Sequence, residues 1–277
     1  MELAKIVRQR NPNSAWLLNH RKNVTSQCGE DGIIEKIFER LPRSDEMTCV
    51  EFGAWDGRMF SNTYNLTTNR GWRSLYIEAD EKKFVDLQNT FKDNSKAFLV
   101  NKLVHFDNDY DTLDKILASS DWPADFDLLS IDIDGNDYHV WNSLTLFSPK
   151  VVIVEFNPTI PNDIHFVQER SMSVNQGSSL LAFQALGRSK GYQLVCVTEW
   201  NAIFVRDEFF NQFEISDNSP DAMHVPVLDG RIFQAFDGTI YTFGIPKLLW
   251  HDVELGHEDF QVLPKSMRVY GVYSKST

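Results

Sequence analysis

A short stretch near the start of the chain combines one acid with two glycines. The apolar run 48–52 contains Glu51, and the turn after it carries Gly53, Asp56 and Gly57. Because glycine reaches positive φ and has no Cβ, such a turn lets a ligand approach the backbone closely. The run before it has the composition of a buried parallel strand. The pattern acid-x-Gly-x-x-x-Gly therefore predicts a binding turn at a strand end, with an ordinary strand-to-loop connection as the alternative.

Strand-like and helix-like segments alternate beyond this turn. We expect strands at 48–52, 74–78, 97–100, 126–133 and 151–156, and helices at 33–41, 61–69, 81–91, 111–118, 137–144 and 178–190. This alternation predicts a parallel sheet with helices on both faces. The runs 192–197 and 202–205 are separated by a short turn, so they form a hairpin with at least one antiparallel strand. A second hairpin is expected at 233–241, around Asp237-Gly238.

Polar side chains recur where the predicted strands end. Ligands of open α/β sheets bind at the carboxyl ends of the strands, so these side chains are the first candidates for a site. Each one alone could equally be a helix cap or a loop carboxylate. Their recurrence predicts one shared site, formed by Glu51, Glu78, Asn101, Asp132, Asp134, Glu155 and Asn157.

The acids also indicate what kind of ligand this site would take. Glu78 follows Gly57 at the tip of the next strand, where a carboxylate can accept hydrogen bonds from ribose hydroxyls. The turn lacks the G-x-G-x-x-G pattern, and no feature here is suited to holding a pyrophosphate. Its acids, Glu51 and Asp56, favour an adenosine compound with positive charge. S-adenosylmethionine fits this description better than NAD.

At this point the chain resembles a known family, the S-adenosylmethionine-dependent methyltransferases of the FkbM type. The resemblance spans residues 26 to about 206 and rests on Ser26-Gln27-x-Gly29-Glu30-Asp31, Val50-Glu51-Phe52-Gly53-Ala54-x-Asp56-Gly57, Tyr76-Ile77-Glu78, Ile131-Asp132-Ile133-Asp134-Gly135 and Val154-Glu155-Phe156-Asn157. It implies an α/β fold, a Rossmann-like seven-stranded methyltransferase sheet with a C-terminal antiparallel hairpin. We divide the chain into an N-terminal arm or cap (1–25), a methyltransferase domain (26–206) and a small β-rich C-terminal extension (207–277).

The resemblance also implies roles for the residues at the strand ends. Glu51, Gly53 and Gly57 would line the methionine end of the cofactor, Glu78 the ribose, Asp132 the floor of the site, and Asn101 or its neighbours the adenine. The predicted cofactor-binding set is Gln27, Glu51, Gly53, Ala54, Asp56, Gly57, Glu78, Ala79, Asn101 and Asp132. The chain departs from the family in Asp134-Gly135-Asn136-Asp137, where we expect a glutamate-containing version, and residues 207–277 have no counterpart.

Methyl transfer mainly requires that donor and acceptor be aligned, while an oxygen acceptor must also lose its proton. The candidate catalytic residues are Asp132, Asp134, His139 and His165. For each histidine, a structural role is the alternative. A divalent cation such as Mg²⁺ could assist by lowering the pKa of the acceptor hydroxyl. Its predicted oxygen ligands are Asp132, Asp134, Glu155 and Asn157.

The predicted function is therefore O-methylation of a polar small molecule or a sugar by S-adenosylmethionine. Two alternatives stay open. Asp132-x-Asp134 is also the D-x-D of metal-dependent glycosyltransferases, although that reading leaves the glycine turn unexplained. The domain could otherwise be a non-catalytic binding module on the same fold, with the aromatic residues of the extension as its docking surface or as a small core.

Composition limits the cellular compartment and the classes of partner that we expect for this chain. A net charge of −12 argues against nucleic acid as a partner. No run reaches the roughly 18 apolar residues of a spanning helix, so no membrane partner is expected, and we see no signal-peptide pattern. The three cysteines, Cys28, Cys49 and Cys196, form no metal-type pair and fit a reducing compartment, so we expect a cytoplasmic protein. The oligomeric state stays open, with a homodimer as one option.

Overall fold

The computed structural model describes residues 9–228 and 230–271. The chain divides into two compact units. Unit 1 comprises Met1–Asn157 and Asn162–Val225, and unit 2 comprises Pro158–Pro161 and Pro226–Thr277. Each unit is described by itself.

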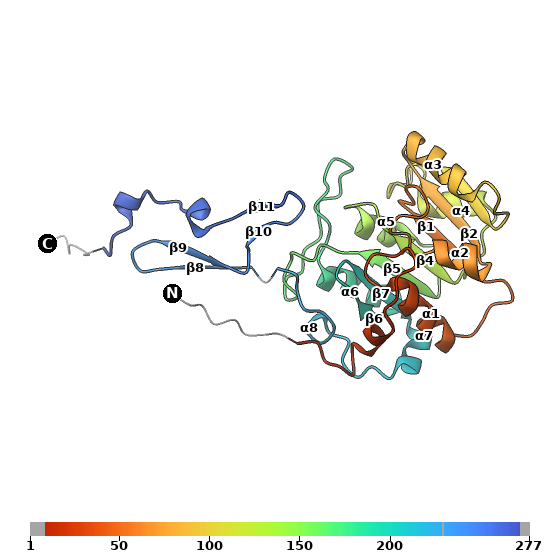
Figure 1. The fold of residues 1–277 in the computed structure, drawn as a ribbon, viewed down its shortest axis with the longest axis horizontal. Helices are drawn as coiled ribbons and strands as arrows, with labels where there is room; N and C mark the ends of the chain where they lie inside the picture. The colour runs from red at the N-terminus through yellow and green to blue at the C-terminus, as the bar shows by residue number, and fades with distance from the viewer. Residues whose placement is uncertain (1–8, 229, 272–277) are drawn as a thin grey trace. The chain divides into compact units, whose positions relative to one another are not determined.

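Unit 1 is built on a seven-stranded sheet with the order β3-β2-β1-β4-β5-β7-β6 (Figure 1). The strands are β1 (Thr48–Phe52), β2 (Arg73–Glu78), β3 (Ala97–Asn101), β4 (Leu128–Ile131), β5 (Val151–Glu155), β6 (Tyr192–Val197) and β7 (Asn201–Arg206). Strands β1 to β5 pair in parallel, while β7 pairs antiparallel with both β5 and β6. The predicted Rossmann-like seven-stranded sheet with an antiparallel terminal hairpin is confirmed.

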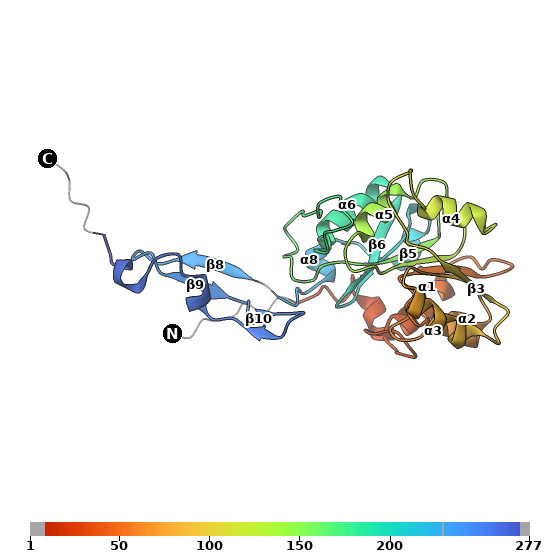
Figure 2. The ribbon, with the colours of Figure 1, turned by 90° about the horizontal axis from the view of Figure 1, so that it is seen from above.

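Helices cover both faces of this sheet, as predicted. They are α1 (Glu30–Arg40), α2 (Tyr64–Arg70), α3 (Glu81–Phe91), α4 (Leu113–Ser119), α5 (Asp137–Ser143) and α6 (Leu180–Ser189). Figure 2 shows α4, α5 and α6 on one face and α1, α2 and α3 on the other. All residues of β1 and β4 are buried, which explains why these strands are continuous apolar runs with few polar positions.

Two elements differ from the sequence-based expectation because side chains capture backbone groups. Strand β4 is shorter than the predicted 126–133 and ends at Ile131, and the backbone N–H of Ile133 donates to Asp137 Oδ1 at 2.9 Å. Helix α2 begins at Tyr64, later than a cap at Ser61 predicts. The Ser61 hydroxyl still accepts a hydrogen bond from the Tyr64 N–H at 2.9 Å, as a capping side chain would.

The end of unit 1 lies beyond the predicted boundary at residue 207. After β7 the chain forms α7 (Asp207–Phe210), the 3₁₀ turn Asn211–Phe213 and α8 (Pro220–Met223). Phe213 and Met223 are buried in the core of unit 1, so this segment belongs to the domain and not to the extension. The described part of the N-terminal arm packs here as well, since Leu17 is buried and Trp16 Nε1 donates to the carbonyl of Phe213 at 3.0 Å.

Unit 2 consists of short antiparallel pairs and turns. Strand β8 (Arg231–Gln234) pairs with β9 (Ile240–Phe243), and β10 (Lys247–Leu248) pairs with β11 (Val253–Glu254). The 3₁₀ turns His257–Phe260 and Lys265–Met267 follow. The predicted hairpin around Asp237-Gly238 is confirmed, and Gly238 has a φ of 86° in its turn. Between residues 231 and 271 no side chain is buried. In the described part of the chain, no helix combines the length and the apolar character needed to cross a bilayer.

Candidate functional site

The glycine turn after β1 lies directly against the end of β4. A Cβ added at Gly53 would lie 1.6 Å from the carbonyl oxygen of Asp132, and the φ of Gly53 is +73°. Gly57, with a φ of +74°, packs on α3, where an added Cβ would come within 2.4 Å of Leu87 Cδ1. Only glycine fits either position. The two glycines therefore fix the turn onto β4 and α3, before any ligand is considered.

Glu51 is buried beneath this turn and is fully engaged by the loop before α2. Its carboxylate accepts hydrogen bonds from the Ser61 hydroxyl at 2.6 Å, the Thr63 hydroxyl at 2.7 Å and the Asn62 N–H at 2.9 Å. Burial raises the pKa of Glu51, while these hydrogen bonds act in the opposite direction. The carboxylate is thus directed into the protein. Its observed role is to hold the loop 61–63, and the expectation that it lines the methionine end of a ligand stays a prediction.

Glu78 joins the tips of β1 and β2. Its Oε2 accepts a hydrogen bond from the Trp55 N–H and its Oε1 from the Asp80 N–H, both at 2.7 Å. A carboxylate offers about four acceptor positions, so each oxygen keeps capacity for a further donor. Asn101, at the end of β3, donates from Nδ2 to the Glu78 carbonyl at 2.8 Å, and Ala79 is exposed beside it. Glu78 is therefore both a clamp on the glycine turn and an available acceptor.

A hollow of about 420 Å³ opens beside the same turn. It brings together two segments that are distant in sequence, the loop before α1 and the end of the glycine turn. The lining residues are Asn23, Val24, Thr25, Ser26, Gln27, Asp56, Arg58, Met59 and Phe60. Sequence reasoning identified Gln27 and Asp56 but missed the rest. The volume lies within the range of small-molecule sites, roughly 300–1,000 Å³.

Asp31, in the first turn of α1, shapes one wall of this hollow. Asp31 Oδ2 accepts hydrogen bonds from the backbone N–H groups of Val24, Thr25 and Ser26, at 2.7 to 2.9 Å. The Ser26 hydroxyl donates to the same oxygen at 2.8 Å. One buried carboxylate thereby folds the loop 23–26 over the start of α1. This is the structural content of the Ser26-Gln27-x-Gly29-Glu30-Asp31 pattern.

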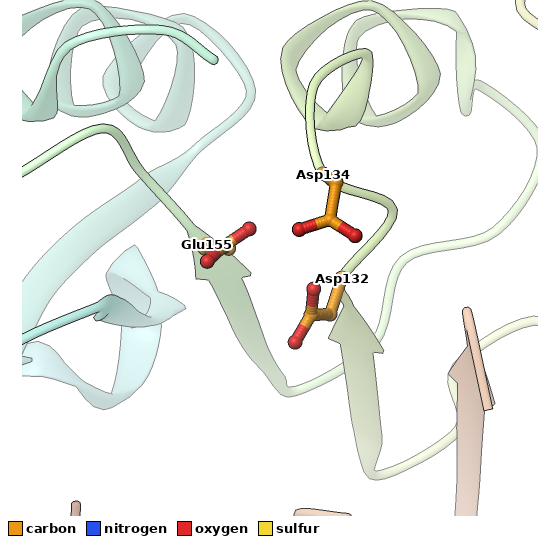
Figure 3. A group of neighbouring side chains, drawn as sticks. All are labelled: Asp132, Asp134 and Glu155. Atoms are coloured by element: carbon orange, nitrogen blue, oxygen red, sulfur yellow. The ribbon is translucent and has the colours of Figure 1, made fainter. Parts of the chain in front are cut away.

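Three carboxylates face one another at the ends of β4 and β5. Ligand oxygens of Asp132, Asp134 and Glu155 all lie within 4.8 Å of one another, and Figure 3 shows the side chains converging. Burial, followed by the neighbouring negative charges, raises the pKa of both Asp132 and Glu155 well above the ordinary range. Such a group of acids is stabilised by a shared proton or by a cation.

The loop after β4 positions Asp134 through a fourth acid. Asp137 Oδ1 accepts from the Ile133 N–H and Oδ2 from the Gly135 N–H, both at 2.9 Å. The two bonds bracket Asp134, whose φ of 55° is rare for a residue with a side chain. Burial raises the pKa of Asp137 to about 6. The departure from the family pattern, Asp134-Gly135-Asn136-Asp137, is thus a locally self-bonded turn that carries Asp134 into the group.

The remaining predicted residues are placed differently. His139 is buried, with Nε2 2.9 Å from the Gln168 carbonyl and its ring beside Phe106, which favours the structural alternative. His165 is exposed on the segment between β5 and α6. Asn157 Nδ2 donates to the Gln176 carbonyl at 2.7 Å, so its amide holds this segment in place.

Sequence reasoning missed Gln168, which holds the long segment 156–179 against the loop after β4. It is buried, and its Nε2 donates to Asn136 Oδ1 at 2.8 Å and to the Val174 carbonyl at 3.0 Å. Its Oε1 accepts from the N–H groups of Gln176 and Gly177, both at 2.9 Å. Every side-chain donor and acceptor position of Gln168 is thus used. No local pattern signals this role, because the partners lie six to 32 residues away.

Comparisons with known proteins gave likenesses among solved structures alone. No family model and no curated protein matches the chain. It is similar to the CMeT domain of the citrinin polyketide synthase (13% identity, 64% of this chain and 50% of that chain, TM-score 0.45). It is also similar to the CurJ carbon methyltransferase (13% identity, 64% of this chain and 52% of that chain, TM-score 0.43). A third similar structure is the N-terminal domain of EvdMO1 with SAH bound (12% identity, 64% of this chain and 80% of that chain, TM-score 0.42). The chain thus spans about half the length of the first two structures, and the FkbM type stays a prediction.

Proposed function

We propose that this chain is an S-adenosylmethionine-dependent methyltransferase that acts on an oxygen of a polar small molecule or a sugar. The observation that carries the proposal is that four adjacent strands of the sheet bear acids at or beside their carboxyl ends. Strands β2, β1, β4 and β5 are neighbours in that order, and they bear Glu78, Glu51, Asp132 and Glu155. The glycine turn joins the two halves of this edge, since it is held by Glu78 and rests on Asp132.

The donors and acceptors around the turn fit a cationic adenosine compound. Glu78 retains acceptor capacity for ribose hydroxyls beside the turn. Asp31 Oδ1 and Asn62 Oδ1 are buried acceptors without a hydrogen-bond donor among the described residues, and an ammonium group is a donor that suits such atoms. Asp31 also binds Ser26, which lines the 420 Å³ hollow. These residues would hold the ligand and orient it, while the negative charge of the edge favours a sulfonium.

The chemistry at β4 and β5 is that of accepting a proton. S-adenosylmethionine, when bound, supplies a methyl group whose transfer leaves a neutral sulfide. An acceptor hydroxyl then has to lose its proton, and a carboxylate with a raised pKa is a stronger base than an ordinary one. Asp132 and Glu155 are such groups, and Asp134 is the most exposed member of the trio.

A divalent cation is the second part of the proposal. The donor set fits Mg²⁺, because Asp132, Asp134 and Glu155 offer carboxylate oxygens within 4.8 Å of one another and Asn157 adds an amide oxygen nearby along the chain. A cation held there would lower the pKa of a bound hydroxyl. It would also reduce the repulsion between the three acids and so stabilise the folded chain, which is a second reason to expect a cation there.

Ligand-dependent melting tests the proposal against its alternatives. We expect S-adenosylhomocysteine at about 100 times its Kd to stabilise the chain by roughly 2.7 kcal/mol, visible as a rise in Tm. A rise with a UDP-sugar and Mn²⁺ in place of S-adenosylhomocysteine would support the glycosyltransferase alternative. No rise with either ligand would support a non-catalytic module. Glu78→Ala, assayed alongside, shows whether the stabilisation passes through the predicted site.

A further inference from the structure

Unit 2 exposes an unusual amount of apolar surface for its size. None of its residues between 231 and 271 is buried, and many large apolar side chains lie open to solvent. They include Ile232, Phe233, Phe236, Leu248, Val253 and Val262. An isolated two-stranded hairpin is marginally stable at best, and a third strand or a covering element is normally needed. The hairpin β8–β9 therefore needs a further strand or element to pack against.

The register of the hairpin shows which backbone groups point outward. The Ala235 N–H donates to the Thr239 carbonyl at 2.8 Å, and Phe233 lies opposite Tyr241 two residues further along. Hydrogen-bonded and non-hydrogen-bonded pairs alternate in an antiparallel ladder. The N–H and C=O groups of Phe233 therefore face β9, whereas those of Ile232 and Gln234 face away from it.

The two edges of this hairpin differ. On β9, the outward N–H and C=O of Ile240 are both taken by the Gln261 side chain, at 2.9 and 2.7 Å. On β8, the outward groups of Ile232 and Gln234 have no backbone partner among the described residues. Figure 2 draws β8 along one side of this unit, with β9 beside it. The β9 edge is thus covered at Ile240 and, among the described residues, open only at Thr242, whereas the β8 edge is open at both of its outward residues and is the longer template for a strand.

We propose that β8 pairs antiparallel with β8 of a second copy of this chain, in the register centred on Phe233. In this register Ile232 lies opposite the second copy's Gln234, and Gln234 opposite its Ile232. These are hydrogen-bonded pairs, so all four outward groups of each strand find partners. A sheet of four strands, β9-β8-β8-β9, replaces two marginal hairpins. Its two-fold symmetry limits the assembly to two copies, because the β8 edge of each copy is used.

The side chains of β8 suit this arrangement. Phe233 already stacks on Tyr241, with ring centroids 5.4 Å apart and an interplanar angle of 18°. In the proposed register Phe233 faces its own copy in a non-hydrogen-bonded pair, where Cα atoms lie about 4.5 Å apart and side chains are closest. The aromatic stack then continues across all four strands. Arg231, the one charged residue of β8, lies opposite Ala235 of the second copy, so the two cations do not face each other.

The charge of the unit makes other occupants less suitable. From residue 226 to residue 271 the sequence holds six acidic and four basic residues, without a basic cluster along β8. An anionic membrane surface or a nucleic acid backbone would require the opposite balance. The edge also carries no proline and no lysine, the usual devices that keep an exposed strand from pairing.

Matched proline substitutions on the two edges test the pairing. Ile232→Pro removes an outward N–H of β8, and Thr242→Pro removes an outward N–H of β9, so each leaves the ladder within the hairpin intact. We expect sedimentation velocity of the full chain, from about 1 to 200 μM, to show a monomer–dimer equilibrium. Ile232→Pro should weaken it by roughly tenfold or more, and Thr242→Pro should leave it unchanged.

Cysteine trapping tests the register. In a Cys28→Ser background, which removes the one cysteine that is not buried, Phe233→Cys should form a disulfide-linked dimer on mild oxidation. Phe236→Cys is more exposed but lies off the two-fold axis, so it should cross-link poorly. A wild-type chain that stays monomeric throughout, equal behaviour of the two proline variants, or faster cross-linking at position 236 would each overturn the proposal.

Discussion

The two halves of the acidic sheet edge are built in opposite ways. At the tips of β1 and β2, Glu51 and Glu78 receive hydrogen bonds from the protein itself, five in all. At the tips of β4 and β5, Asp132, Asp134 and Glu155 face one another, and their charges repel. Carboxylates on one side of the sheet are thus satisfied by hydrogen bonds from the protein, and those on the other side face like charges.

This difference suggests how to distinguish a structural carboxylate from one with a functional role. A buried acid surrounded by N–H and O–H donors is satisfied, so removing it costs stability. A half-buried acid that faces other acids is held against charge repulsion, and acids with pKa values raised in this way are typical of functional sites. We therefore expect substitutions on the β1–β2 side to affect folding and binding, and those on the β4–β5 side to affect turnover.

The largest expected effect follows from Asp132→Asn. The amide cannot accept the acceptor's proton and is a poorer cation ligand, so we expect kcat to fall by roughly 10² to 10⁴. Thermal unfolding should show a chain at least as stable as the wild type, because one of the repelling charges is gone. A folded variant with wild-type turnover would remove Asp132 from the reaction.

The converse expectation concerns Glu51→Ala. Removing this carboxylate leaves the Ser61 and Thr63 hydroxyls and the Asn62 N–H without their acceptor in a buried loop. We expect the free energy of unfolding to fall by about 3 kcal/mol in urea denaturation. If Glu51→Ala unfolds at the same urea concentration as the wild type, Glu51 is not the scaffold described here.

Glu78→Ala should have an intermediate effect and should act on binding. Calorimetry with S-adenosylhomocysteine is expected to show a loss of roughly 1–3 kcal/mol in affinity, because charge-assisted hydrogen bonds to the ribose are lost. Glu78→Gln keeps one neutral acceptor oxygen and should lose less. Equal affinities for the wild type and Glu78→Ala would reject the ribose assignment and leave Glu78 as a clamp on the turn alone.

The smallest effect is a slope of stability with pH. The pKa values of Asp132 and Glu155 are raised in the folded chain, so the native state binds more protons than the unfolded state above about pH 4. Their contribution is fully present below that pH and is lost as the pH rises toward the folded-state pKa values.

We expect the difference in unfolding free energy between Asp132→Asn and the wild type to grow in favour of the variant by about 1–2 kcal/mol from pH 5 to pH 9. Mg²⁺ added at pH 9 should raise the Tm of the wild type and leave that of Asp132→Asn nearly unchanged. A difference that is constant across this range would show that the trio is not electrostatically strained.

The order of strands and helices followed from the sequence wherever apolar periodicity decided it. The runs 81–91 and 192–197 were predicted to the residue, because α3 and β6 are bounded by their own caps and turns. The extent of β4 was overestimated, since nothing in the apolar run 126–133 shows that Asp137 takes the Ile133 N–H. Local sequence patterns predict the extent of a strand or helix well, except where a side chain from outside it forms hydrogen bonds with its backbone groups.

The site was predictable in its location more than in its details. Acids at strand ends were recognised, and Asp132, Asp134 and Glu155 do converge. The inward orientation of Glu51 was not foreseen, because its partners come 10 to 12 residues later. Gln168 was missed for the same reason, as its value depends on a loop that only the folded chain assembles.

The close approach of Gly53 to the Asp132 carbonyl has a mechanical consequence. With no room between them, the turn after β1 and the tip of β4 cannot slide independently, so any displacement of one pushes on the other. An adenosine ligand that binds against the turn would therefore change the positions of Asp132 and Asp134, two strands away from Glu78. Binding of a ligand at the turn after β1 would therefore shift the acids at the end of β4 without any hinge motion.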